Sequence, residues 1–374
     1  MEREIALIKR IMKILLAVSF VALAGCSIDL SGPTDKPPTS IDITDTPAPT
    51  ESPAFVGAPD RSATPLPWVS SHLSGHLIYL KVPRQIIELD LASGERTVLF
   101  DASNNAFVSA AQVSSDGKRI VMAYAPPEDP SVQTVNTDLY VMPADGSTAP
   151  QALLKRTSAK EDFFNPVWSP DGKYVYYSHL MPGANDTSKY TNFTYDLERV
   201  AFPGGQPQKL IDNAFWPRLS PDGSKLAYVS FISSTNSNDV YIANPDGSQA
   251  KLVMPAGAFF AVDAPLFSPD GNTIVFSAVG EPQLPSLSLL DQLMGVQIAE
   301  AHNVPSDWWR VSIEGGKPER LTQINGTGMY ADYAPDGQHI AFASITGLFV
   351  MQPDGSNLIQ LINDGLGGTV SWIP

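Results

Sequence analysis

A four-residue turn, repeated at near-regular intervals, constrains the fold of this chain more than any other feature. The turn has the form Ser-Pro-Asp-Gly, and a short run of β-forming residues follows each copy. Proline fixes φ at the first corner, Asp bonds the local backbone, and Gly takes the positive φ that ends the turn. Each copy therefore predicts a tight connection between two antiparallel strands. The five copies are Ser114-Ser115-Asp116-Gly117, Ser169-Pro170-Asp171-Gly172, Ser220-Pro221-Asp222-Gly223, Ser268-Pro269-Asp270-Gly271 and Ala334-Pro335-Asp336-Gly337.

A second set of glycine turns alternates with the first. Each copy follows one β-type run, such as Asp138–Met142, and precedes another, such as Gln208–Ile211. Together the two turns define a unit of four strands, A to D, with the first turn between A and B and the second between C and D. Repeated four-stranded units in a large all-β chain indicate propeller blades. We therefore expect an all-β fold, a six-bladed β-propeller of four-stranded blades over residues 67–374. The second turns are Ala92-Ser93-Gly94, Ala144-Asp145-Gly146, Pro203-Gly204-Gly205, Pro245-Asp246-Gly247, Glu314-Gly315-Gly316 and Pro353-Asp354-Gly355.

The first blade lacks a first turn of its own, and the C-terminal residues resemble a lone strand A. Val370-Ser371-Trp372-Ile373-Pro374 is similar to Val167-Trp168-Ser169-Pro170. We expect residues 369–374 to supply strand A of blade 1 and so to close the ring without an open edge. The alternative is that Pro67-Trp68-Val69 forms this strand.

These repeats resemble the WD40-like repeats of the TolB family over roughly residues 70–374. Trp168-Ser169-Pro170-Asp171-Gly172 is the best single copy. The resemblance implies a TolB-like propeller. TolB proteins carry an additional α/β domain before the propeller and act with the lipoprotein Pal in envelope integrity, whereas here a Pro-rich segment precedes the propeller. A structural role in a TolB/Pal-type envelope system is therefore one function that the resemblance implies.

The N-terminal residues have the pattern of a bacterial lipoprotein signal. Basic residues precede an apolar run, Ile14–Leu23, which is too short to span a bilayer. Leu23-Ala24-Gly25-Cys26 resembles the lipobox, in which cleavage leaves a lipid-carrying (palmitate-type) cysteine as the first mature residue. We expect residues 1–25 to be a signal peptide and Cys26, the single cysteine of the chain, to be lipidated. The alternative is an ordinary secretory signal with an incidental cysteine.

The next segment and the charge of the chain define the expected location. Residues 26–66 are rich in Pro and Thr and have little to bury, so they predict a disordered, lipid-anchored tether. The net charge of −15 repels phosphate backbones and anionic headgroups. We therefore expect no nucleic-acid partner, and membrane attachment only through the lipid on Cys26. The chain is expected to be an exported monomer at the cell envelope, on the outer membrane or the outer face of the cytoplasmic membrane.

Catalytic signatures are absent from the sequence. It contains no Gly-x-Ser-x-Gly elbow, His-Glu-x-x-His motif or phosphate-binding glycine loop. The Asp residues of the turns recur in equivalent places, which indicates structure, and the five histidines show no metal-ligand spacing. We expect no catalytic residue, metal or cofactor, and a non-catalytic module that binds a protein or a glycan. The alternative is an envelope polysaccharide hydrolase or lyase that uses His302 and carboxylates at the channel mouth.

Candidate ligand-binding residues lie where each strand A begins, a position that lines the mouth of a propeller channel. A mixture of aromatic, amide and charged side chains at that position is typical of ligand pockets. An insertion between strands B and C of blade 5, Glu281–Asp307, has the apolar spacing of a short helix. It predicts either a lid or docking element over the face with the long loops, or a helix that packs against its own blade or plugs the ring. The candidates are Phe107, Asn165, Trp216, Arg218, Asp263, Tyr330 and Asp332 on strands A, and His302 in the insertion.

Overall fold

The computed structural model describes residues 72–102, 105–126, 135–182, 193–232, 237–279, 304–363 and 367–374. Over these residues the chain forms strands and turns, without a helix. Within the same residues no helix is long and apolar enough to cross a membrane. The signal-peptide, Cys26, tether and Glu281–Asp307 predictions fall wholly or largely outside this range and stay predictions.

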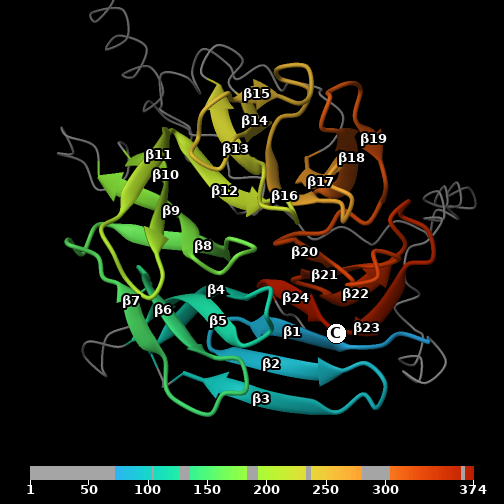
Figure 1. Ribbon diagram of the computed structural model, residues 1–374. Coiled ribbons are helices and arrows are strands. Elements are labelled where there is room, and N and C mark those ends of the chain that lie inside the picture. Colours follow the sequence, from blue (N-terminus) through green and yellow to red (C-terminus); the bar gives the residue numbers. More distant parts are fainter. Residues whose placement is uncertain are drawn as a thin grey trace, which may run out of the picture. The chain divides into compact units, whose positions relative to one another are not determined.

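Six four-stranded antiparallel sheets surround a central axis, with the first strand of each sheet nearest the centre (Figure 1). This confirms the six-bladed all-β propeller. Blade 1 contains β24 (Val370–Ile373), β1 (His76–Lys81), β2 (Gln85–Asp90) and β3 (Arg96–Asp101). Blade 2 contains β4 (Phe107–Val113), β5 (Arg119–Ala125), β6 (Asp138–Pro143) and β7 (Gln151–Leu154). Blade 3 contains β8 (Asp162–Trp168), β9 (Tyr174–Pro182), β10 (Phe193–Ala201) and β11 (Gln208–Asp212).

The remaining three blades repeat the same order. Blade 4 contains β12 (Ala214–Leu219), β13 (Leu226–Ile232), β14 (Ser237–Ala243) and β15 (Lys251–Leu252). Blade 5 contains β16 (Val262–Phe267), β17 (Thr273–Ala278), β18 (Asp307–Ser312) and β19 (Glu319–Arg320). Blade 6 contains β20 (Tyr330–Tyr333), β21 (Ile340–Ser344), β22 (Gly347–Met351) and β23 (Ile359–Ile362).

The five first turns join the first and second strands of blades 2 to 6, and in blades 2 to 5 the first residue is a serine whose hydroxyl has a structural role. In blade 4 the Ser220 hydroxyl donates to Asp222 Oδ1 at 2.6 Å and accepts the Lys225 amide at 2.9 Å. Gly223 has φ +70° and donates its amide to the Ser220 carbonyl at 2.8 Å. The same Ser–Asp hydrogen bond recurs in blades 2, 3 and 5. These bonds stay within six residues, so each turn forms from its own local sequence.

The C-terminal strand closes the ring, as predicted. β24 pairs antiparallel with β1, with His76 opposite Ile373 and Tyr79 opposite Val370. Trp372 is 6% exposed, and its indole Nε1 donates to the Ser74 carbonyl at 3.0 Å. Blade 1 therefore combines the last described strand of the chain with the first three. The alternative strand, Pro67-Trp68-Val69, lies outside the described residues.

The apolar core lies between neighbouring blades. One cluster joins Ile78 and Leu80 of blade 1 to Val108, Ile120 and Met122 of blade 2. Packing of one sheet face against the next is how a stacked sheet buries its apolar side chains. Each blade thus depends on both neighbours.

Buried aspartates at the start of the third strand fix the loops that lead into the next blade. Asp138 Oδ1 accepts the Arg156 amide at 2.8 Å, and Asp307 Oδ1 accepts the Ile324 amide at 2.6 Å. Asp239 accepts the Gly257 amide at 3.1 Å in the same way. A carboxylate is a strong acceptor for otherwise unpaired loop amides. These contacts set the path of the chain into each following inner strand.

Candidate functional site: a pocket among the inner strands

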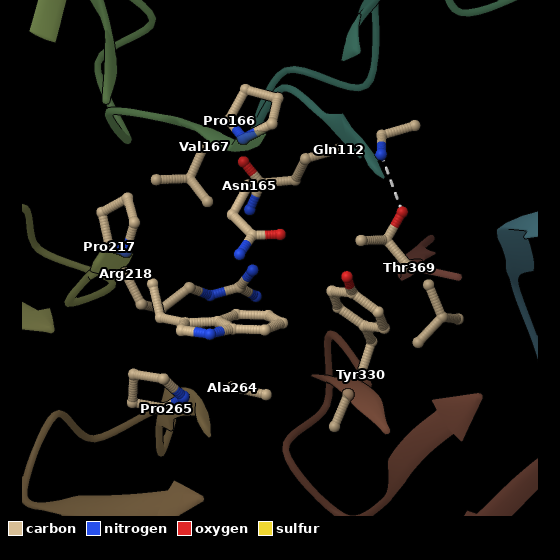
Figure 2. Close-up of a pocket in the computed structure, with 14 residues that line it drawn as sticks. Gln112, Asn165, Pro166, Val167, Pro217, Arg218, Ala264, Pro265, Tyr330 and Thr369 are labelled. Carbon is tan, nitrogen blue, oxygen red and sulfur yellow. Dashed lines mark hydrogen bonds between the residues drawn. The ribbon is translucent and has the colours of Figure 1, made fainter. Parts of the chain in front are cut away.

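All six inner strands, β4, β8, β12, β16, β20 and β24, contribute side chains to one pocket on the ring axis (Figure 2). The pocket volume is about 480 Å³, including open solvent. This value counts the open mouth of the pocket together with the enclosed space, so it is an upper bound on the room for a ligand.

Three bulges in successive inner strands shape the pocket wall. The pairing of β8 with β9 shifts register between Phe164 and Val167, and β12 and β16 shift at equivalent places. At each bulge the first extra residue has positive φ and the second is proline, which has no N–H to give to the ladder. A bulge redirects side chains out of the regular alternation, and all six bulge residues line the pocket. They are Asn165-Pro166 (φ +49°), Trp216-Pro217 (φ +58°) and Ala264-Pro265 (φ +47°).

The backbone at two of these bulges is strained. Asn tolerates left-handed φ, but for other L-residues this conformation costs about 1–2 kcal/mol. Trp216 and Ala264 both adopt it. The Trp216 amide donates to the Ser178 hydroxyl of blade 3 at 3.1 Å, which helps to hold the bulge. Strain of this kind clusters at functional sites.

An aromatic pair forms one side of the pocket. The rings of Trp216 on β12 and Tyr330 on β20 have centroids 5.1 Å apart and are tilted by 49°. Both residues are partly buried and both line the pocket. They offer an apolar surface on which a ring of a ligand can pack.

Amide and hydroxyl groups converge from the opposite side. Asn165 is 8% exposed, makes no hydrogen bond to the described residues, and its amide points into the pocket beside Arg218 (Figure 2). Gln112 Oε1 accepts the Trp168 amide at 2.7 Å. Thr369 Oγ1 accepts the Ala111 amide at 2.8 Å (Figure 2). The last two bonds fix both side chains in place at the pocket wall.

An ion pair connects non-adjacent blades beside the pocket. Arg218 Nη2 on β12 of blade 4 donates to Asp332 Oδ1 on β20 of blade 6. Asp332 Oδ2 accepts the amide of Trp372 on the closing strand at 3.0 Å. Burial raises the pKa of the Asp332 carboxyl, and the Arg218 charge and the Trp372 amide oppose this rise. The pair ties blades 4, 6 and 1 together and orients the guanidinium.

The structure brings four of the sequence-predicted residues into this pocket: Asn165, Trp216, Arg218 and Tyr330. Asp332 contacts Arg218 without lining the pocket itself. Asp263 is 1% exposed, precedes the Ala264 bulge and does not line the pocket. Phe107 begins β4 and is also outside the lining. His302 lies outside the described residues.

Gln112, Thr369 and the three bulges were not predicted from the sequence. A signal for the bulges exists, because Pro166, Pro217 and Pro265 each stand three residues before the serine of a Ser-Pro-Asp-Gly turn. Proline within a predicted central strand indicates a bulge. Gln112 and Thr369 have no comparable signal, since their blades depart from the repeat.

A second polar cluster lies inside blade 3, away from this pocket. Glu198 on β10 accepts the Tyr177 hydroxyl at 2.5 Å and lies 3.1 Å from His179 Nδ1, both on β9. Burial acts to raise the pKa of Glu198, but the bonds from His179 and Tyr177 outweigh it and hold that pKa below its usual value. Among the described residues, no group of three or more His, Cys, Asp or Glu could hold a metal ion.

Comparisons with known proteins support the fold. No protein-family model matches the chain. Dipeptidyl-peptidase 5 of Trichophyton equinum is 27% identical over 176 residues, which is 45% of this chain but only 22% of that enzyme. An uncharacterized protein of Agrobacterium fabrum is 25% identical over 252 residues, covering 57% of this chain and 76% of that protein. The chain thus spans about a fifth of the length of the peptidases it matches.

Solved structures of TolB proteins share the architecture. TolB from Acinetobacter baumannii matches with a TM-score of 0.56 at 16% identity, over 79% of this chain and 65% of that one. A putative TolB from Agrobacterium tumefaciens matches with a TM-score of 0.50 at 18% identity, over 80% of this chain and 98% of that one. The chain has the TolB-like propeller fold that its repeats predicted.

Proposed function

We propose that this protein is a non-catalytic binding module displayed at the cell envelope, which holds one residue of an envelope glycan in its central pocket. The observation that carries the proposal is the composition of that pocket. Six inner strands converge on it, an aromatic pair forms one side, and the buried Asn165 amide points into it without a partner among the described residues. A ring to stack on and polar groups that fix its orientation are what a sugar-sized ligand requires.

Display at the envelope rests on the N-terminal sequence. The lipobox-like Leu23-Ala24-Gly25-Cys26 supports lipid attachment, and residues 26–66 suit a tether between lipid and propeller. The resemblance to TolB repeats supports the same location. Growth with labelled palmitate tests this directly: the wild-type chain takes up label, and Cys26→Ser does not. Equal labelling of both would refute the anchor.

The pocket favours binding over catalysis. Within the described residues, its lining contains no Asp, Glu or His side chain, and Arg218 and Tyr330 are its titratable groups. General acid–base catalysis needs a positioned group that exchanges a proton near the working pH. A hydrolase or lyase would depend on His302, and release of new saccharide ends from envelope polysaccharide would establish it. Co-purification with a Pal-type lipoprotein would instead support the TolB/Pal-type structural role.

A glycan array tests the binding role. The purified full-length chain is compared with Trp216→Ala, and with Phe193→Ala as a matched control, since Phe193 is an exposed aromatic outside the pocket. We expect Trp216→Ala to lose up to about tenfold in affinity, because an aromatic ring contact typically contributes about 0.5–1.5 kcal/mol and about 1.4 kcal/mol corresponds to a factor of ten. Equal binding by all three proteins would show that the central pocket is not the site.

A further inference from the structure

We propose that the pocket recognises a carboxylate, held by Arg218 and Asn165, on a ligand whose ring packs against Trp216 and Tyr330. This inference rests on the proposed function, because it names the ligand chemistry of the same pocket. It is carried by the hydrogen-bonding groups that the lining leaves unused.

Arg218 is the strongest of these groups. A guanidinium has five N–H donors, and its single hydrogen bond to the described residues goes from Nη2 to Asp332. The side chain is only 19% exposed, so water reaches little of it. A largely buried cation with most of its donors unused gains from a ligand acceptor.

The neighbouring groups add further donors. The Asn165 amide has no partner among the described residues, and Figure 2 shows it pointing into the pocket next to the Arg218 guanidinium. Gln112 uses its Oε1 for the Trp168 amide and so presents its NH₂ group. Thr369 accepts the Ala111 amide, which leaves its hydroxyl proton to donate. The lining is therefore rich in donors.

The charge distribution of the pocket lining favours a negatively charged ligand. Arg218 is the charged side chain of the described lining, and no lining carboxylate faces it. Asp332 lies behind the lining and directs one part of the guanidinium away from the ligand, with its second oxygen occupied by the Trp372 amide. A cationic ligand would find no charged acceptor here. A carboxylate can accept two parallel N–H bonds from one guanidinium.

The aromatic pair places the rest of the ligand. Trp216 and Tyr330 lie on strands β12 and β20, the strands that also carry Arg218 and Asp332. Trp216 is two residues from Arg218 in the same bulged segment. A ring packed on this pair thus lies within reach of the guanidinium. The ligand class is a ring that bears a carboxylate.

Calorimetric titration of the full-length chain with matched ligand pairs tests this inference. N-acetylmuramate and N-acetylglucosamine differ by a lactyl carboxylate, and benzoate and benzyl alcohol form a pair without sugar chemistry. We expect each acid to bind at least tenfold more tightly than its neutral counterpart. Arg218→Lys retains the positive charge and the pairing with Asp332 but loses the planar guanidinium that donates two parallel N–H bonds. We expect this variant to bind the acids at least tenfold more weakly. Asn165→Ala should weaken them as well.

The control variant is Arg310→Lys, because Arg310 pairs with Glu319 outside the pocket. It should leave every affinity unchanged. Equal binding of acids and neutral partners, or acid binding that survives both Arg218→Lys and Asn165→Ala, would overturn the carboxylate assignment. Neutral sugars that bind through Trp216 alone would overturn it while leaving the proposed function intact. Binding of benzoate without N-acetylmuramate would uphold the carboxylate and overturn the glycan.

Discussion

Because the C-terminal strand closes the ring, we expect the stability of the propeller to depend strongly on Trp372. Its side chain is almost fully buried in a cluster with Leu77 and Tyr79 of β1, and its Nε1 bonds the Ser74 carbonyl. Replacing a buried Trp by Ala typically costs about 3–5 kcal/mol. Loss of the hydrogen bond to Ser74, an exposed residue whose carbonyl can then bond water, costs about 0.5–1.5 kcal/mol more. We therefore expect Trp372→Ala to lower the free energy of unfolding by about 5 kcal/mol.

Equilibrium urea unfolding of the full-length chain, followed by circular dichroism, measures this change. Trp372→Phe keeps most of the buried ring and loses the bond to Ser74, so it should cost about 1–2 kcal/mol. Val98→Ala is the control, because Val98 is an exposed residue of the outer strand β3 and should change stability by less than about 0.5 kcal/mol. A cost below about 1 kcal/mol for Trp372→Ala would mean that β24 does not hold blade 1 in the cooperative unit.

Three further predictions follow from the turns, the bulges and the buried aspartates. Hydrogen bonds from Ser169 and Ser220 lower the pKa values of Asp171 and Asp222 to about 2. The ionised carboxylates therefore stabilise the fold above about pH 4, and this stabilisation is lost as the pH falls toward 2. The midpoint of urea unfolding should be lower at pH 2.5 than at pH 5, and an unchanged midpoint would contradict the prediction. Glycine adopts left-handed φ without strain, whereas Ala264 does not. Ala264→Gly should therefore lower the free energy of unfolding by about 1–2 kcal/mol less than Ala341→Gly, a buried position in the regular strand β21. Equal losses in denaturant unfolding would refute strain at Ala264. Asp307→Ala removes the acceptor for two loop amides and a partner of Arg320, and a thermal scan should show about 3 kcal/mol of destabilisation; a loss under 1 kcal/mol would show that the loop is held by other contacts.

The fold could be read from the sequence because its main signal is local. In the turn at Ser220, the bonds among Ser220, Asp222, Gly223 and Lys225 form without help from distant residues. Five turns of this kind, alternating with six copies of the second glycine turn, predicted six blades. The closing strand was also predictable, because Trp372 occupies in β24 a position like that of Trp168 in β8.

The pocket was only partly predictable. Asn165, Trp216, Arg218 and Tyr330 were expected because the inner strands of a propeller surround its channel. Their directions depend on bulges, and the bulge in β16 puts Ala264 rather than the neighbouring Asp263 into the lining.

The Arg218–Asp332 pair was beyond the reach of sequence reasoning. It joins strands that belong to blades 4 and 6, more than a hundred residues apart in the chain. No local pattern sets their distance, which follows from the geometry of the closed ring. The buried aspartates of the third strands show the same limit, since their partners lie in loops beyond the fourth strand.

An NMR titration followed at the indole N–H signal of Trp216 measures whether the pocket among the inner strands holds the ligand. Trp216→Phe identifies that signal among those of the six tryptophans. N-acetylmuramate, or the best ligand of the glycan array, is then added to the full-length chain. We expect a saturable shift of the Trp216 signal, with the signal of Trp372 in the closing strand much less affected. Saturable shifts of other residues with the Trp216 signal unchanged would place the binding site elsewhere and refute ligand binding in the central pocket.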